Sequence, residues 1–407
     1  MSTLHERIEE LAEINSEREG GGITREVYTP EYDRAVDFVA ELMREAGLAT
    51  RLDAAGNLLG RWEGTEPDEP RVLTGSHFDT TLNAGRFDGV VGVLGAIEAV
   101  RELRAAGVEP RRSIEVIGIA GEEPRFGAGC IGSRAMAGTI TREQLEEMRD
   151  REGVSVAEAM RARGLDPDRL ADALLDAEHV LAFVELHIEQ GAVLESAGAE
   201  IGVVERIAAP HDLRVTLRGS AMHAGATPMS LRRDALAGAS EVVLELERLA
   251  LGSASGTTVG TVGVQRVSPG AVNIIPGEVV MDIDVRDSDG EARERVVEAL
   301  RGKLEEMVAR RGLELSVSTL TRDDPAACSP LVIEAVRDTC QELGVRHLAM
   351  ISGAYHDAMV LGAKVPMGMI FVPSVGGLSH HPDEYTEAAD IDRGVRVLAG
   401  ALARLAR

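Results

Sequence analysis

The sequence predicts an α/β fold in which a smaller domain interrupts a larger one. Helical and strand patterns alternate over the first part of the chain, which is typical of a mostly parallel sheet with helices on both faces. The order then changes to β-α-β-β-α-β, the ferredoxin-like unit, before the alternation resumes. We therefore predict a larger domain formed by residues 1–209 and 322–407, with an inserted α+β domain at 210–321. A chain of 407 residues is long enough for two cores.

Apolar spacing identifies the elements of the first segment. Residues 31–48 carry apolar side chains at helical intervals and include Gly47, a residue type common at helix ends. The same spacing predicts helices at 90–107, 141–153 and 168–177. Short apolar runs predict strands at 71–77, 113–123 and 179–191.

The inserted segment begins with alternating apolar and polar residues, as in a half-buried strand. Its predicted strands are 211–220, 257–267, 277–287 and 313–321. Its predicted helices are 232–251 and 290–312. The last segment is predicted to contain helix 330–343, strand 347–352, a short helix, strand 365–373 and helix 390–406.

Composition excludes several classes of function. The net charge of −25 argues against nucleic acid as a partner, because such binding depends on Lys and Arg neutralising phosphates. No apolar run approaches the roughly 18 residues that span a bilayer, so we expect no membrane association. The three cysteines are odd in number and widely spaced, which argues against a disulfide framework and predicts a cytoplasmic location.

Histidine and acidic side chains collect where four of the predicted strands end. They are His77 and Asp79, Glu122 and Glu123, His187 and Glu189, and His380 and His381. In open α/β sheets ligands bind outside the carboxyl ends of the strands, so we expect these four groups to converge. Asp88, in a loop just before a predicted helix, can lean toward the same place.

Each group also has a purely structural explanation. The segment around Asp88 reads as a polar turn, Glu122 and Glu123 as a solvated turn, and His187 as a hydrogen-bonded core histidine. Four coincident placements at strand ends favour a metal site over four separate accidents.

The residue types suit divalent metal chemistry. Imidazole and carboxylate ligands fit zinc, manganese or cobalt, and a site without cysteine ligands is unlike a structural zinc site. Two neighbouring ions need a bridging carboxylate, and one further carboxylate must stay uncoordinated to take a proton from water. Glu122 and Glu123 together can supply a base and a ligand. The Asp79 carboxylate is expected to accept the second ring N–H of His77 and fix its tautomer.

Several motifs occur in an order that resembles one family. They are TGSHFDTTLNAGRFDG, EEPRFGAGCIGSR, ELHIEQG, HAGATPM, NIIPG, DIDVRD, SGAYHDAM and GLSHHPDEYT. From about residue 5 to the C-terminus the chain resembles the dinuclear-metal amidohydrolases, which include N-carbamoyl-L-amino acid, allantoate and ureidoglycolate amidohydrolases. One departure is EEPRF, which is a residue shorter than forms with two residues between Glu-Glu and Arg-Phe.

The resemblance implies two divalent ions per subunit, Zn, Mn or Co. His77 would bind one ion, His187 would complete its shell, and Asp88 would bridge both ions. Glu123 would be a terminal ligand, and His380 would complete the shell of the second ion. Glu122 would be the general base. The inserted domain would act as a lid and as the interface of a homodimer.

The resemblance also implies the substrate contacts. His223 would reach the partner subunit's site and stabilise the tetrahedral oxyanion. Gln190, Asn273 and Arg286 would hold the substrate, with Arg286 gripping its carboxylate, and Gly353 would offer backbone contacts. A single well-placed guanidinium would let a very acidic protein bind an acidic small molecule.

The activity implied is hydrolysis of the ureido C–N bond of an N-carbamoyl-L-amino acid, with release of ammonia, carbon dioxide and the amino acid. Ureidoglycolate and allantoate remain alternative substrates, and an aminoacylase or dipeptidase would share the metal ligands. A non-catalytic protein that binds a small acidic metabolite is the alternative from another class.

Overall fold

The computed structural model describes residues 3–16 and 20–407. It forms two compact units. Unit 1 contains the described residues up to Glu205, together with Ala327–Met350 and His356–Arg407; unit 2 contains Arg206–Ala326 and Ile351–Tyr355. That the inserted segment acts as a lid and a dimer interface stays a prediction.

Within the described residues, a large sheet of nine strands forms the centre of unit 1. They are β1 (Ala49–Leu52), β2 (Leu58–Trp62), β3 (Arg71–His77), β4 (Ile114–Ile119), β5 (Val180–Ile188), β6 (Ile201–Ile207), β11 (Ala326–Ala327), β12 (His347–Ser352) and β13 (Met367–Val372). The order is β1-β2-β4-β3-β5-β13-β6-β11, and β12 also pairs with β6.

The centre of this sheet is parallel and its flanks are antiparallel. Strands β4, β3, β5 and β13 pair in parallel, whereas β1 with β2, β2 with β4, and β13 with β6 are antiparallel. Strands β4 and β13 are buried along their whole length. This explains the continuous apolar sequence of β13, whereas β4 includes the buried Glu115. The prediction of an α/β fold with a mostly parallel sheet is confirmed.

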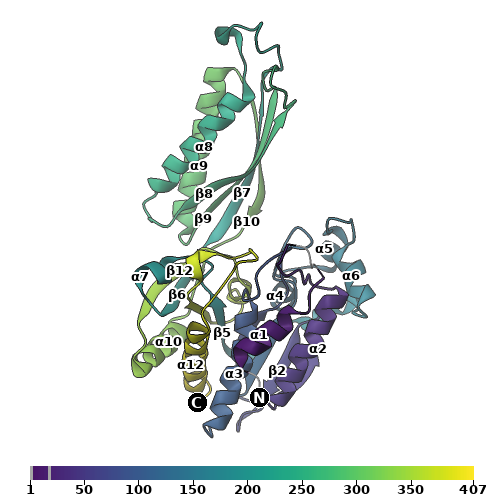
Figure 1. Cartoon of the computed structure of the whole chain (residues 1–407), viewed down its shortest axis with the longest axis vertical. Helices are drawn as coiled ribbons and strands as arrows, with labels where there is room; N and C mark the ends of the chain where they lie inside the picture. Colours follow the sequence, from purple (N-terminus) through teal and green to yellow (C-terminus); the bar gives the residue numbers. More distant parts are fainter. Residues whose placement is uncertain (1–2, 17–19) are drawn as a thin grey trace. The chain divides into compact units, whose positions relative to one another are not determined.

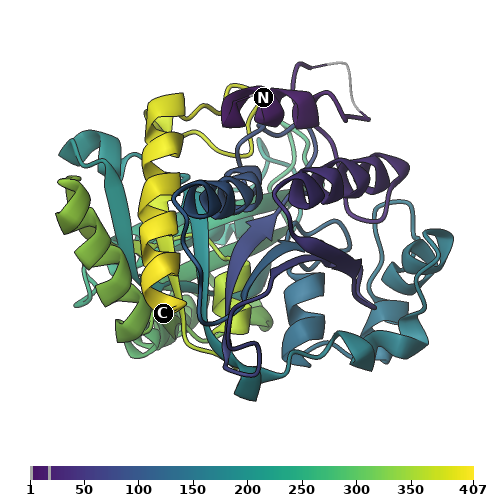
Figure 2. The same ribbon diagram turned by 90° about the horizontal axis from the view of Figure 1, so that it is seen from below.

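Helices cover both faces of the sheet. Leu186 contacts Gly394 of α12, whereas its neighbour Glu185 accepts a hydrogen bond from the amide of Ala358 in α11. Because consecutive strand residues point to opposite faces, α12 and α11 lie on opposite sides. Figure 2 shows α12 (yellow) in front of strands of the sheet. The helices of unit 1 are α1 (Leu4–Ala12), α2 (Pro30–Glu45), α3 (Val90–Ala105), α4 (Ile131–Ala137), α5 (Arg142–Glu147), α6 (Val156–Ala162), α7 (Val193–Ala197), α10 (Pro330–Leu343), α11 (Asp357–Leu361) and α12 (Ala388–Leu405).

Unit 2 contains a four-stranded antiparallel sheet with two helices on one face (Figure 1). Its elements are β7 (Ala209–Arg218), α8 (Ala235–Leu251), β8 (Val259–Ser268), β9 (Glu278–Asp287), α9 (Gly290–Arg311) and β10 (Glu314–Arg322), and the strand order is β10-β7-β9-β8. Strand β9 buries Met281, Ile283 and Val285 in the core of this unit. The intervening Asp284 and Arg286 point to the opposite, polar face.

Some elements differ from the sequence prediction. The strand predicted at 113–123 ends at Ile119, because Gly121 has a positive φ of 70° that turns the chain. The helix predicted at 141–153 ends at Glu147, and 168–177 is mostly a 3-10 turn at Pro167–Ala173. Strands β1, β2 and β6 lie in segments for which the sequence pattern predicted no element.

Among the described residues, no helix combines the length and the apolar character that crossing a bilayer requires.

Candidate metal centre

Asp88 lies at the middle of the site, between β3 and α3. Gly89 follows it with φ of 65°, and a Cβ at Gly89 would lie 2.5 Å from the ring of His77. Glycine is therefore required at this position, because the backbone runs directly against the ring of His77. The Asp-Gly pair in the sequence is explained by this close approach.

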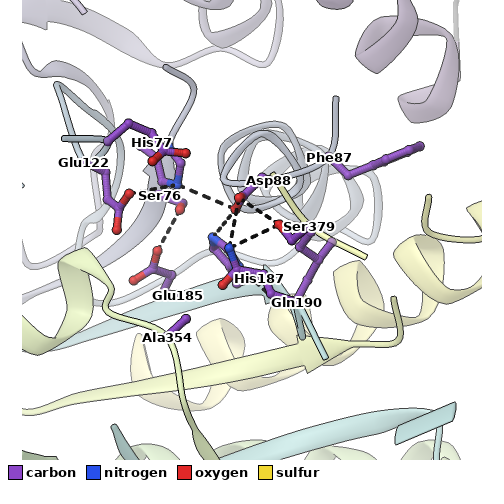
Figure 3. Close-up of polar contacts among 12 residues, drawn as sticks. Ser76, His77, Phe87, Asp88, Glu122, Glu185, His187, Gln190, Ala354 and Ser379 are labelled. Carbon is purple, nitrogen blue, oxygen red and sulfur yellow. Dashed lines mark hydrogen bonds and ion pairs between the residues drawn. The ribbon is translucent and has the colours of Figure 1, made fainter. Parts of the chain in front are cut away.

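The two oxygens of Asp88 face two different sets of donors. Oδ1 lies 3.2 Å from Nε2 of His187 and 3.9 Å from Nε2 of His77. Oδ2 lies 3.1 Å from Nε2 of His380, which is itself 3.4 Å from Oε1 of Glu123. Figure 3 shows Asp88 with dashed lines to His77, His187 and neighbouring polar groups. All five predicted metal ligands thus meet around one shared carboxylate.

These residues fit divalent metal ions. Among the described residues, three groups have donor atoms within 4.8 Å of one another. Two of them share Asp88, namely His77, Asp88 and His187, and Asp88, Glu123 and His380. The third is Glu185, His187 and His356. Within the described chain, Asp88 Oδ1 and His187 Nε2 are buried without a hydrogen-bond partner. Buried polar atoms are almost always satisfied, so two such atoms facing each other fit a metal ion between them.

His187 is prepared to donate a lone pair. Its Nδ1 donates to the carbonyl of Ile188 at 2.9 Å, which leaves Nε2 facing Asp88. Burial lowers the pKa of His187. The neutral imidazole that a metal requires is therefore the favoured form.

Glu122 and Glu123 occupy different places. Glu123 belongs to a ligand set, whereas Glu122 lies with Oε2 3.7 Å from Nε2 of His77. Burial raises the pKa of Glu122 well above its usual value, although the charge of His77 opposes the shift. Burial and then the charge of Asp88 raise the pKa of Glu123 to about 8.

The role predicted for the Asp79 carboxylate is wrong. The ring Nδ1 of His77 donates to the backbone carbonyl of Asp79 at 3.1 Å, and Oδ1 of Asp79 is 3.6 Å away. The carboxylate instead accepts the amides of Glu122 at 3.4 Å and Glu123 at 3.1 Å. Asp79 therefore holds the backbone of both glutamates, and the tautomer of His77 is fixed by the main chain.

Gln190 reaches the bridging carboxylate. It has a positive φ of 58°, and its Nε2 donates to Oδ2 of Asp88 at 2.9 Å. Of the two consecutive histidines, His380 faces Asp88, whereas Nδ1 of His381 accepts the amide of Asp383. Glu189 accepts two amides at the start of α7, which is a capping role.

Sequence reasoning missed a layer of buried polar residues beside these ligands. The buried ones are Glu185, His356, Asp357 and Glu384, and the half-buried Ser379 lies with them. Ser379 donates to Asp88 Oδ2 at 3.1 Å, and the ring of His356 lies 4.6 Å from that of His187. Glu185 accepts from Ser76 at 2.6 Å (Figure 3), and an acidic residue inside the run VLAFVELHI was the available signal.

The predicted substrate residues of unit 2 lie in two places. His223 pairs with Ile274 in an isolated β-bridge, and the amide of Ala224 donates to the carbonyl of Asn273. His223 and Asn273 are both exposed. The ring Nδ1 of His223 accepts the amides of Gly225 and Ala226 at 3.1 and 3.2 Å, so the ring proton is on Nε2.

Arg286 lies at the other end of the sheet in unit 2. Asp284 accepts from its Nε at 2.9 Å and pairs with its Nη2 at 2.8 Å. Its Nη1 donates to the carbonyl of Gly353 at 3.3 Å. The guanidinium is thus oriented by a carboxylate on its own strand face.

Comparison with known proteins identifies the family. Residues 67–404 match the peptidase family M20/M25/M40. The chain belongs to this family. A Geobacillus stearothermophilus protein named N-carbamoyl-L-amino acid amidohydrolase is 46% identical over 99% of this chain and 98% of its own length. A ureidoglycolate hydrolase of Oryza sativa subsp. japonica is 43% identical over 99% of this chain and 84% of its own.

A solved structure is also similar to this M20 family member in both fold and sequence. The crystal structure of AtUAH in complex with (S)-hydroxyglycine aligns with a TM-score of 0.85 and 42% identity, over 99% of this chain and 97% of the other. The predicted resemblance is confirmed. The chain is a hydrolase that acts on amide C–N bonds, within the carbamoylase and allantoate amidohydrolase group.

Proposed function

We propose that the chain hydrolyses the ureido C–N bond of an N-carbamoyl-L-amino acid and releases ammonia, carbon dioxide and the amino acid. The observation that carries this proposal is the arrangement around Asp88. Each of its oxygens faces its own pair of ligands, while Glu122 lies beside His77 and outside both ligand sets. A bridging carboxylate with one adjacent uncoordinated carboxylate suits water attack on a planar ureido carbon.

The proposed site holds two divalent ions, Zn, Mn or Co, in each subunit. His77 and His187 would hold one and Glu123 and His380 the other, with Asp88 shared. When bound, such ions polarise the ureido carbonyl and lower the pKa of water. The donor set of nitrogen and oxygen atoms supports this choice of metals.

Glu122 is the proposed general base and acid. As water attacks the ureido carbon, Glu122 takes one of its protons. It then gives that proton to the nitrogen of the C–N bond that breaks, so the carboxylate returns to its starting state. Burial raises the pKa of Glu122, which suits a group that must both accept and return a proton near neutral pH.

Arg286 is proposed to bind the carboxylate of the substrate. Its contacts with described residues use three of the five guanidinium N–H groups, namely those to Asp284 and Gly353. An Nη edge remains for the substrate. Gln190 and the backbone of Gly353 are the proposed neighbouring contacts, and Gln190 has an unpaired buried Oε1 within the described chain.

His223 and Asn273 are proposed to come from the partner of a homodimer. Asn273 precedes the start of β9, and His223 pairs with Ile274 beside it, whereas Arg286 is near the end of β9. At about 3.3 Å per residue, the pair is therefore roughly 25 Å from Arg286. A small ureido acid is too short to span that distance. One site can therefore use Arg286 of its own chain and the partner subunit's His223, whose Nε2–H would donate to the developing oxyanion.

The charges of the two units support dimer formation through unit 2. Unit 2 carries 15 basic and 18 acidic residues, whereas the rest of the chain carries 28 and 50. Two copies brought together through unit 2 avoid most of the repulsion between the acidic units. Exposed apolar side chains flank His223 and Asn273 in sequence, namely Met222, Met229, Leu231 and Val272.

Ureidoglycolate is the second candidate substrate. The rice relative with that name is nearly as similar as the carbamoylase, and EEPRF departs from the longer form of the motif. Allantoate shares the same ureido and carboxylate groups. An acyl or peptide bond would be cleaved if the chain were an aminoacylase or dipeptidase.

Release of ammonia from the ureido acids, and of free amino acid from the N-acetyl-amino acids and dipeptides, tests these choices. The purified protein is incubated with N-carbamoyl-L-amino acids, ureidoglycolate, allantoate, N-acetyl-amino acids and dipeptides, before and after chelation and with Zn, Mn or Co added back. We expect metal-restored ammonia release, fastest with an N-carbamoyl-L-amino acid. Faster turnover of ureidoglycolate would change the proposed substrate to ureidoglycolate, whereas the proposed reaction, hydrolysis of a ureido C–N bond, would stand. Cleavage of the acylated amino acids or dipeptides alone would overturn the proposal.

A further inference from the structure

Glu384 is a buried carboxylate that the proposed chemistry does not use. It lies in the loop between β13 and α12 and is 3% exposed. Its Oε1 accepts the backbone amides of Phe87 at 2.9 Å and Asp88 at 3.1 Å. These contacts join segments almost 300 residues apart in sequence.

The other oxygen of Glu384 reaches the side chain of Asp88 through a hydroxyl. Oε2 lies 2.9 Å from Oγ of Ser379, and the same Oγ lies 3.1 Å from Oδ2 of Asp88. Glu384 therefore contacts both the main chain of Asp88 and, through Ser379, its carboxylate.

The chain makes room for Glu384. A Cβ at Gly85 would lie 2.3 Å from Oε1 of Glu384, so this position accommodates the carboxylate because it has no side chain. Beside it, the rings of Phe87 and Tyr385 meet edge to face with centroids 5.7 Å apart. The two loops are therefore packed together by neighbours of Glu384 as well as by its hydrogen bonds.

Both loops carry proposed metal ligands. One ends in Asp88, and the other contains His380, four residues before Glu384. His380 has a positive φ of 53°, a conformation that a non-glycine residue keeps when its surroundings hold it. The 3.1 Å approach of His380 to Asp88 thus depends on how these two loops are joined.

We propose that Glu384 is a positioning residue that holds Asp88 and the His380 loop in the geometry that binds metal. This rests on the metal-binding part of the proposed function and not on the choice of substrate. The essential property is the acceptance of two amides together with contact to Ser379. A glutamine can supply both, because its carbonyl accepts the amides and its NH2 donates to Ser379, whose hydroxyl then donates to Asp88.

The test measures metal affinity in metal-free full-length protein, without substrate. Zn²⁺ or Mn²⁺ is titrated against a competing fluorescent chelator for the unchanged protein and for Glu384→Ala, Glu384→Gln and Asp289→Ala. Asp289 is the matched control, because its carboxylate also accepts two amides, those of Glu291 and Ala292, in unit 2. Thermal unfolding of each variant is recorded alongside.

We expect Glu384→Ala to weaken metal binding by about 10–100-fold. Glu384→Gln and Asp289→Ala are expected to bind metal as the unchanged protein does. If Glu384→Ala does not fold, Glu384→Asp takes its place, because the shorter side chain keeps the charge but loses the reach. Unchanged affinity in the Ala or Asp variant, or equal weakening in the Gln variant, would overturn the proposal. Because no substrate is present, failure of the proposed reaction leaves this result interpretable.

Discussion

The two groups of proposed functional residues differ in how much of their geometry their own unit determines. In unit 1 the side chains of His77, Asp88 and His187 are at most 4% exposed, and each is fixed by neighbours. In unit 2 His223 and Asn273 are exposed, and only the ring orientation of His223 is set locally. Burial within one unit therefore sets the geometry of this part of the candidate metal centre. The positions of the exposed His223 and Asn273 side chains depend more on what binds them.

The largest effect is expected from a substitution in unit 1 that stops proton transfer without removing metal. Glu122→Gln should lower kcat by about 10²–10⁴-fold, because the amide cannot take a proton from water. Metal content should stay unchanged, since Glu122 lies outside both ligand sets. Steady-state kinetics and metal analysis measure the two effects. Glu123→Gln is the control variant, because the same change at the neighbouring glutamate is expected to cause loss of metal. Full activity in Glu122→Gln would show that Glu122 is not the general base.

A somewhat smaller effect tests whether unit 2 serves the partner's site. His223→Ala should lower kcat by about 10²–10³-fold through loss of an oxyanion donor. When this variant is mixed and re-equilibrated with Glu122→Gln, half of the randomly paired dimers contain one complete site. Activity should recover to about a quarter of that of the unchanged homodimer. No recovery, with subunit exchange verified by differently tagged chains, would mean that His223 does not act across the dimer.

The smallest effect is the pH dependence of stability that arises from burying the carboxyl group of Glu123 in unit 1. Burial and Asp88 raise the pKa of Glu123 from 4.5 to about 8, so in this interval the folded chain holds a proton that the unfolded chain releases. The stability of the metal-free protein should therefore fall as pH rises from about 4.5 to about 8. Thermal unfolding of chelated protein at pH 5.5 and 8 measures the slope. Glu123→Gln should show a shallower slope, and an equally steep one would assign the effect to other groups.

The sequence predicted the parts of the molecule that follow from strand direction. Strand β3 has the predicted bounds, and the rule that ligands collect at the carboxyl ends of strands brought His77, Glu123, His187 and His380 together with Asp88. Periodicity says nothing about which distant loops touch. Ser379 and Glu384 were missed for that reason, because their contacts with Asp88 span almost 300 residues.

Errors near strand ends had a local cause. The strand at 113–123 was predicted too long, because the run of apolar residues continues past Ile119 while Gly121 turns the backbone. The role of Asp79 was wrong because side-chain spacing cannot show that a backbone carbonyl is the nearer acceptor. Residue types predicted a metal site, and only the fold could assign the hydrogen bonds around it.

The carboxylate of Asp79 has a consequence for how this loop tolerates changes in length. It holds the consecutive amides of Glu122 and Glu123 from a fixed position just past β3. Both glutamates are therefore anchored before the chain enters the shortened EEPRF segment. An inserted or deleted residue after Glu123 alters the path toward α4 but leaves the anchor in place. The wall of the site after Glu123 can therefore change while the spacing of the two carboxylates stays the same.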